Sequence, residues 1–186
     1  TVKSFIYNSV FSTTSFTLTV LDSGCSPGEF ETDNIAGSWT SMVSICDFNE
    51  DGHQDIASIR TGTILSIDIR HGSAGFTGGT NVAVGANPRY LAIGDVNGDG
   101  HQDLLVTNSL GDNVSIRLGD GMGDFSGNTD IPIGGAPYKI ELGDFDEDGN
   151  LDFVTTDFDH KVSIRLGDGN GNFVSGSFTN DYTNVN

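Results

Sequence analysis

Positive charge is scarce in this sequence. The 186 residues include 8 Lys and Arg against 26 Asp and Glu, so the formal net charge is −18. Nucleic acids and anionic membrane surfaces attract basic faces, so neither is expected as a partner. The sequence also lacks any apolar run of about 20 residues, which a membrane-spanning helix requires. We therefore expect no membrane insertion.

Cysteine and proline are also rare, at 2 and 4 residues. Cys25 and Cys46 have neither the Cys-x-x-Cys spacing nor the His cluster of a zinc site, so zinc is not expected. They would close a loop of about 20 residues, and a disulfide there would contribute roughly 3 kcal/mol. We predict this disulfide for an oxidising compartment, with two free thiols as the alternative.

A helical period of 3.6 residues is missing throughout, whereas glycine is abundant at 26 residues. Scattered glycines among Val, Ile, Phe and Thr are typical of short strands joined by tight turns. The sequence therefore predicts an all-β fold.

Three acidic segments repeat in register. Each follows the pattern Asp-x-[Asn/Asp]-x-Asp-Gly-x-x-Asp, numbered here as positions 1 to 9, and they start at Asp47, Asp95 and Asp144. The starts are 48 and 49 residues apart. A repeat of this length indicates stacked β units rather than a single irregular domain.

The repeat continues after each acidic segment. The run Val-Ser-Ile-Arg-Leu-Gly-Asp-Gly occurs at 114–121 and again at 162–169, and 65–72 aligns with it as a weaker copy. An aromatic residue ends each copy; these are Phe76, Phe125 and Phe173. Each unit is interpreted as four short strands, one before the acidic segment, two after it and one after the aromatic residue. Four strands in about 48 residues is typical of a β-propeller blade.

Domain boundaries follow from the repeat. We expect repeat 1 at 37–84, repeat 2 at 85–133 and repeat 3 at 134–186. Residues 1–36 do not fit the repeat and are expected to be the tail of a preceding β-domain or blade plus a linker. Three blades do not close a propeller, so we expect an incomplete propeller or a fragment of one.

The acidic segments have the composition of a site for a hard cation. Several carboxylates within nine residues repel one another unless a cation neutralises them. Calcium accepts six to eight oxygen ligands, and here the side chains at positions 1, 3, 5 and 9 and the carbonyl at position 7 would supply them. The glycine at position 6 permits a sharp turn. Three alternatives to this calcium loop fit less well. Magnesium demands a tighter octahedron, and an EF-hand requires a Glu at position 12. An ordinary Asp-rich surface turn would not recur three times in register.

These combined motifs resemble the FG-GAP or VCBS repeat family, whose calcium-loop blades are similar to those of integrin α-subunits. The resemblance covers residues 40–176 and implies a calcium-stabilised propeller of the bacterial secreted type. Gly135-Ala136-Pro137 departs from the family pattern, because it lies before the inner strand rather than after the second one. The implied calcium ligands are Asp47, Asn49, Asp51, His53 (carbonyl), Asp55, Asp95, Asn97, Asp99, His101 (carbonyl), Asp103, Asp144, Asp146, Asp148, Asn150 (carbonyl) and Asp152.

Catalytic residues are not expected. The imidazoles of His53 and His101 are expected to face solvent, because position 7 needs only its carbonyl. Asp120 and Asp168 are interpreted as hairpin turn residues, and Arg117 and Arg165 as partners of a nearby Asp. Weak candidates for ligand contact precede the inner strands, at the end of a propeller that often binds ligands. They are Trp39, Arg89, Tyr90 and Tyr138.

Two functions fit these observations. The first is a non-catalytic, calcium-binding extracellular or cell-surface module for adhesion, ligand binding or scaffolding, with other domains of a longer chain and a protein or glycan ligand as partners. The alternative is the propeller part of a polysaccharide-acting lyase or hydrolase with a carbohydrate-binding role. Glycan binding without turnover would favour the first function, and product release the second.

Overall fold

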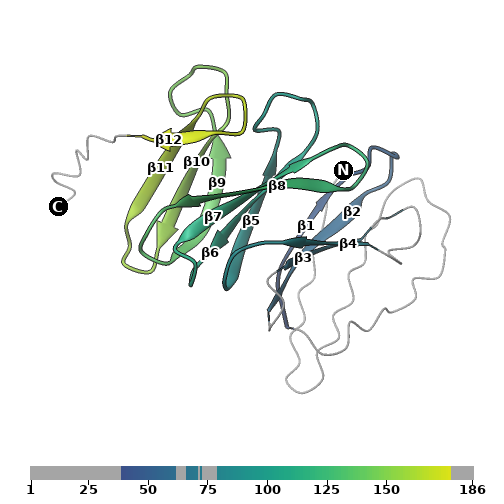
Figure 1. Cartoon of the computed structure of the whole chain (residues 1–186), viewed down its shortest axis with the longest axis horizontal. Helices are drawn as coiled ribbons and strands as arrows, with labels where there is room; N and C mark the ends of the chain where they lie inside the picture. Colours follow the sequence, from purple (N-terminus) through teal and green to yellow (C-terminus); the bar gives the residue numbers. More distant parts are fainter. Residues whose placement is uncertain (1–38, 62–65, 71, 73–78, 177–186) are drawn as a thin grey trace, which may run out of the picture. The chain divides into compact units, whose positions relative to one another are not determined.

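The computed structural model describes residues 39–61, 66–70, 72 and 79–176 (Figure 1). These residues form strands joined by turns and contain no α-helix. It follows that no helix in this part of the chain could cross a membrane. The strands are β1 (Trp39–Cys46), β2 (Asp55–Thr61), β3 (Ser66–Arg70), β4 (Thr80–Ala83), β5 (Pro88–Gly94), β6 (Asp103–Asn108), β7 (Asn113–Gly119), β8 (Phe125–Pro132), β9 (Pro137–Gly143), β10 (Asp152–Asp157), β11 (Val162–Gly167) and β12 (Phe173–Ser175).

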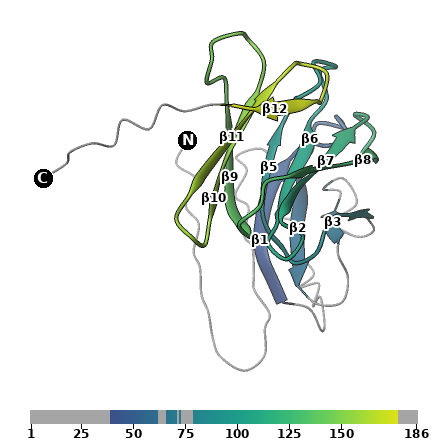
Figure 2. The same cartoon turned by 60° about the vertical axis from the view of Figure 1, so that its left-hand side comes forward.

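The strands form three sheets of four, and each sheet follows the chain order. The sheets are β1-β2-β3-β4, β5-β6-β7-β8 and β9-β10-β11-β12, named here blades 1, 2 and 3. Figure 2 shows the strands of these sheets from a second direction. The all-β fold and the four-stranded repeat unit predicted from the sequence are confirmed.

The strand register corrects one detail of the repeat alignment. Arg70 pairs with Ile56, as Arg117 pairs with Leu104, and both partners occupy position 10 of their repeats. Residues 67–72 are therefore the counterpart of 114–119, and the sequence alignment was wrong by two residues. The error arose because Ser66-Ile67 has the same residues as Ser115-Ile116 but lies two residues earlier in its repeat.

Apolar side chains are buried between neighbouring blades. One cluster joins Phe48 and Ile59 of blade 1 to Leu104 and Val106 of blade 2, and a second joins Leu105 and Ile116 of blade 2 to Phe153 of blade 3, together with further residues of the same blades. All six residues of β6, in the middle blade, are buried. Each Å² of apolar surface that is removed from water stabilises the fold by about 25 cal/mol, so these clusters hold the blades together.

Arginines of the third strands also join the blades. Arg117 Nε donates to the carbonyl oxygen of Ala83 in blade 1 at 2.7 Å, and Arg165 Nη2 donates to that of Pro132 in blade 2 at 3.1 Å. Arg117 also pairs with Asp130 at 3.2 Å, as expected from the sequence. In blades 2 and 3, the arginine of the third strand thus donates a hydrogen bond to the last carbonyl of the preceding blade's fourth strand.

A glycine is required where each third strand passes the acidic loop. A Cβ added at Gly72, Gly119 or Gly167 would overlap the backbone carbonyl oxygen of the residue at position 8. Since backbone cannot yield as a flexible side chain does, the close approach of two chain segments explains the glycine at this place in all three blades.

We expect Gly119→Ala to lower the free energy of unfolding by about 3 kcal/mol, because the methyl group forces two backbone segments apart. Gly127→Ala is the control. Its φ of 79° is unfavourable for alanine, but a Cβ there would meet nothing within 4 Å, so the expected loss is about 1 kcal/mol. Urea unfolding in excess EGTA measures both values, and equal losses would contradict the steric explanation.

Candidate metal centre

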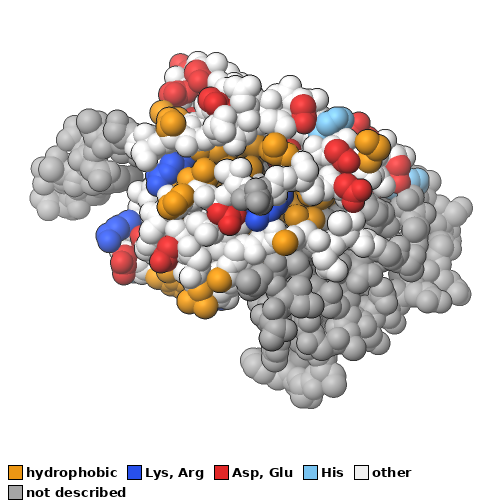
Figure 3. Space-filling model, in the orientation of Figure 1, with side chains coloured by type: hydrophobic (Ala, Val, Ile, Leu, Met, Phe, Trp, Pro, Cys, Tyr) orange, Lys and Arg blue, Asp and Glu red, His pale blue; other side chains and the backbone are white. Residues whose placement is uncertain are grey.

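The three acidic loops connect the first and second strands of each blade. Each loop leaves the end of β1, β5 or β9, and its last aspartate is the first residue of β2, β6 or β10. Figure 3 shows acidic side chains on the surface of the described part of the chain. The aspartate at position 5 is exposed in all three loops. Strands on both sides, rather than helices, agree with the exclusion of an EF-hand.

The aspartate at position 1 organises the turn. One of its carboxylate oxygens accepts the N–H of the glycine at position 6, at 2.9, 2.9 and 3.0 Å in the three loops. The other oxygen accepts the N–H of position 5 in loops 1 and 3 and that of Gly98 in loop 2. The glycine at position 6 has φ of 86°, 92° and 91°, a left-handed conformation that other residues adopt only with strain.

The aspartate at position 5 makes a short local turn. Its Oδ1 accepts the N–H of position 7 at 2.8, 2.9 and 2.8 Å in the three loops. In loop 2 this bond to the His101 N–H lowers the pKa of Asp99, and a bond from Asn97 lowers it further. In loop 2, the His101 N–H and the Asn97 side chain therefore favour the ionised form of Asp99.

The aspartate at position 9 connects three parts of its blade. Asp55, Asp103 and Asp152 are fully buried. One carboxylate oxygen accepts the N–H of position 2 at 2.9, 2.9 and 2.7 Å, and the other accepts that of Gly72, Gly119 or Gly167 at 2.8, 2.9 and 2.8 Å. Burial raises the pKa of Asp103, and the two N–H donors oppose that rise. The sequence pattern indicates only a ligand role for this aspartate, and its structural role in the blade is an additional finding.

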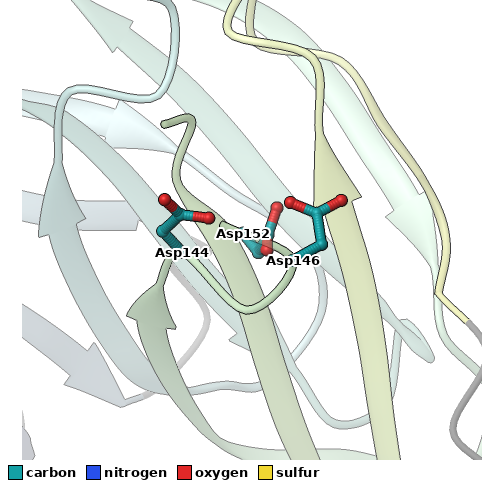
Figure 4. Close-up of side chains that lie close together, drawn as sticks. All are labelled: Asp144, Asp146 and Asp152. Atoms are coloured by element: carbon teal, nitrogen blue, oxygen red, sulfur yellow. The ribbon is translucent and has the colours of Figure 1, made fainter. Parts of the chain in front are cut away.

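Loop 3 gathers the most negative charge. Carboxylate oxygens of Asp144, Asp146 and Asp152 all lie within 4.8 Å of one another (Figure 4). Desolvation raises the pKa of Asp146, and the charge of Asp148 raises it further, followed by those of Asp152 and Asp144. Oxygen ligands alone, at this spacing, fit a hard divalent cation such as calcium. Loops 1 and 2 share the bonds from the N–H groups of positions 2, 6 and 7 with loop 3, but they carry Asn49 and Asn97 at position 3.

Position 7 differs in part from expectation. His53 is exposed, as predicted, but the imidazole of His101 does not simply face solvent. Its Nδ1 lies 2.6 Å from Glu50 Oε1 of loop 1, and this bond raises the pKa of His101. The contact was missed because Glu50 and His101 occupy different repeats, and their separation by 51 residues leaves no pattern in the sequence.

The hairpin aspartates have the turn role that their sequence context indicates. Asp120 Oδ1 accepts the N–H groups of Met122 and Asp124 at 2.8 and 3.2 Å. Asp168 Oδ1 does the same for Asn170 and Asn172. A bond from the Asn172 side chain lowers the pKa of Asp168 most, and the two N–H groups lower it further. Both carboxylates are used in shaping the turns between the third and fourth strands.

The four candidates for ligand contact have different surroundings. Arg89 Nε donates to Ser109 Oγ at 3.2 Å, and Tyr90 packs against the core between blades 2 and 3. Tyr138 is exposed and packs against the exposed Phe158, with ring centroids 5.0 Å apart and an interplanar angle of 50°. The side chain of Trp39 lies outside the described residues.

The predicted disulfide involves one described residue, because Cys25 lies outside the described part of the chain. Cys46 is half-buried with a free thiol, and burial raises the pKa of that thiol. Its pairing with Cys25 stays a prediction.

Comparison with protein-family models agrees with this repeated geometry. The model of the FG-GAP-like repeat matches twice, at residues 47–106 and 95–155, which together span more than half of the chain. The chain belongs to the FG-GAP-like repeat family. Each match begins at position 1 of one acidic loop and runs past the end of the next, so the family model covers all three FG-GAP loops. No curated protein matches the chain.

Proposed function

We propose that this FG-GAP chain is a calcium-stabilised, non-catalytic module of an extracellular or cell-surface protein. The observation that carries the proposal is the gathering of three carboxylates in loop 3 on a backbone that loops 1 and 2 repeat. Asp144, Asp146, Asp148 and Asp152, with the carbonyl of Asn150, would hold the ion there. The corresponding residues of loops 1 and 2 would hold one ion each.

Charge supports a structural role for the ion. Three divalent cations would reduce the net charge from −18 to −12. Relief of repulsion within each loop lowers the free energy of the folded state and leaves the unfolded chain largely unaffected. The ligands belong to the loops themselves, so the ion would hold each first and second strand together rather than activate a substrate.

We expect the affinity of the sites to decrease in the order loop 3, loop 1, loop 2. Loop 3 has a fourth carboxylate at Asp146, and Glu147 adds negative charge beside it. Glu50 gives loop 1 part of this benefit, whereas Gly98 gives loop 2 none. Extracellular calcium modules have Kd values of about 10⁻⁴ to 10⁻³ M. Asp146→Asn should weaken site 3 about tenfold, towards site 1.

Calorimetric titration of the full chain tests both the proposal and the order. Calcium should bind with measurable heat and magnesium much more weakly. The position-5 variants Asp51→Ala, Asp99→Ala and Asp148→Ala should each remove one binding event, at fixed ionic strength because salt screens the charges. If Asp148→Ala removes the weakest event, charge does not set the order. If calcium gives no heat at millimolar concentration, the proposal fails.

The wider role of the module is also a proposal. FG-GAP blades pack on one another through apolar faces, so we propose that these blades contact other domains of a longer chain. We also propose a protein or glycan ligand. Exposed apolar groups on blade 3, including Phe145 and Val162, are in keeping with further contacts.

A carbohydrate-binding role, including one within a polysaccharide-acting enzyme, has one observation in its favour. Tyr138 and Phe158 present an exposed aromatic pair at the end of blade 3 opposite to loop 3. Such faces supply large contact area at low entropic cost. Tyr138→Ala should abolish binding on a glycan array, with Phe145→Ala, an exposed aromatic in loop 3, as the control. Equal glycan binding by the two variants would exclude this surface as the binding site. In a separate assay, release of products from a polysaccharide would indicate an enzyme.

A further inference from the structure

The turn that joins the last two strands of a blade lies against the acidic loop of the preceding blade. We call this segment the outer hairpin; it comprises Asp120–Phe125 in blade 2 and Asp168–Phe173 in blade 3. In blade 3, the Gly171 N–H donates to the carbonyl oxygen of Val96, at position 2 of loop 2, at 3.0 Å. A Cβ at Gly98, position 4 of the same loop, would lie 3.4 Å from the Gly169 carbonyl oxygen. Loop 2 therefore forms part of the surface that receives blade 3.

The same two loop positions contact the next blade in loop 1. The ring of Phe48, at position 2, packs edge to face on Phe125, with centroids 5.6 Å apart. Glu50, at position 4, meets His101 beside the outer hairpin of blade 2, where a Cβ at Gly121 would lie 3.1 Å from Glu50 Oε1. The chemistry of the contacts differs between the two interfaces, but the positions that make them are the same.

A short chain of hydrogen bonds joins the proposed metal ligands to this interface. Asp103 Oδ2 accepts the Val96 N–H at 2.9 Å, and the Val96 carbonyl accepts the Gly171 N–H. Asp103 is the position-9 ligand of loop 2. An ion bound by Asp103 would fix the carboxylate, the peptide groups of Val96 and hence the acceptor that the outer hairpin of blade 3 uses.

Loop 3 provides the contrast. Its position-2 residue, Phe145, is 45% exposed, whereas Phe48 and Val96 are 4% and 1% exposed. In the described part of the chain, no outer hairpin covers it. The arrangement is therefore directional, because loops 1 and 2 each contact their own blade and the blade that follows.

We propose that calcium in one loop fixes the outer hairpin of the next blade, so that occupancy of sites 1 and 2 strengthens the docking of blades 2 and 3. This inference rests on the proposed function, since it needs calcium at these loops. The ion thereby acts between blades as well as within one. Coupling between a site and a neighbouring element is commonly worth about fivefold or more in an equilibrium constant.

Amide hydrogen exchange of the full chain, with and without calcium, tests the proposal. In the parent, calcium should slow exchange in both outer hairpins. With calcium present, Asp99→Ala should speed exchange about fivefold or more at 168–173. Asp51→Ala should do so at 120–125 and leave 168–173 unchanged. Asp148→Ala, which removes site 3, should leave 120–125 unchanged. Glu50→Gln removes no ligand, and it should weaken the effect of calcium at 120–125.

The outcomes separate this proposal from the proposed function. If calorimetry shows that Asp99→Ala has lost one calcium ion while exchange at 168–173 stays at the parent level, the coupling is refuted and calcium binding stands. If Asp148→Ala alters 120–125, the direction is wrong. If the parent neither binds calcium nor changes its exchange, both proposals fail together.

Discussion

Replacing Asp103 with alanine is expected to lower the free energy of unfolding by about 3 kcal/mol or more, even in excess EGTA. The carboxylate is fully buried and accepts N–H groups from Val96 and Gly119. A hydrogen bond to a charged group contributes about 1.5–3 kcal/mol, and its loss leaves a buried donor without a partner. Two such donors would be left in the core of blade 2. Urea unfolding in EGTA measures the loss.

Asp99→Ala is the matched control, because Asp99 belongs to the same loop and the same proposed site but is exposed. Its loss should cost less than about 1 kcal/mol in EGTA, as for most exposed side chains. With calcium present, Asp99→Ala should lose the additional stability that the ion provides. Equal losses for the two variants in EGTA would show that position 9 has no structural role apart from the ion.

Removal of calcium is expected to lower the melting temperature by about 10 °C. At a free concentration ten times Kd, each site contributes about 1.4 kcal/mol, so three sites contribute roughly 4 kcal/mol. In a chain of this size, 1 kcal/mol corresponds to a shift of about 2–4 °C. Thermal unfolding followed by circular dichroism, in calcium and then in excess EGTA, measures the difference.

Two controls make the melting experiment specific. Magnesium at the same concentration should restore little of the stability, because it keeps its water shell and demands a rigid octahedron. The triple variant Asp51→Ala, Asp99→Ala, Asp148→Ala should melt at nearly the same temperature in calcium and in EGTA. A parent melting curve that EGTA leaves unchanged would exclude a structural role for calcium.

The repeat was predictable because the physical causes are local. A glycine at position 6, aspartates at alternate positions and a following Val-Ser-Ile-Arg run recur at fixed spacing, so loop, strand and turn could be assigned from the residues alone. The structure bears out that order of elements in all three blades. The first repeat was the exception, since Ser66-Ile67 shifted the alignment by two residues.

The second role of the position-9 aspartate was not predictable in this way. An aspartate can be a metal ligand or a buried hydrogen-bond acceptor, and the sequence pattern does not distinguish the two roles. Only the strand register reveals that Asp152 accepts the N–H of Gly167 from a different strand. The Glu50–His101 contact depends on how one blade meets the next. Periodicity identifies what each unit contains, whereas contacts between units depend on side chains that vary from repeat to repeat.

We propose that each of the three loops holds one calcium ion. Equilibrium dialysis of the full chain against radioactive calcium, at a free concentration of about 10 mM so that sites of this affinity class are nearly filled, is the most direct test. The parent should bind about three ions per chain, and Asp148→Ala about two, given Kd values near 10⁻⁴ to 10⁻³ M. A parent that saturates at two ions or fewer per chain, or an Asp148→Ala variant that binds as many as the parent, would contradict three occupied loops.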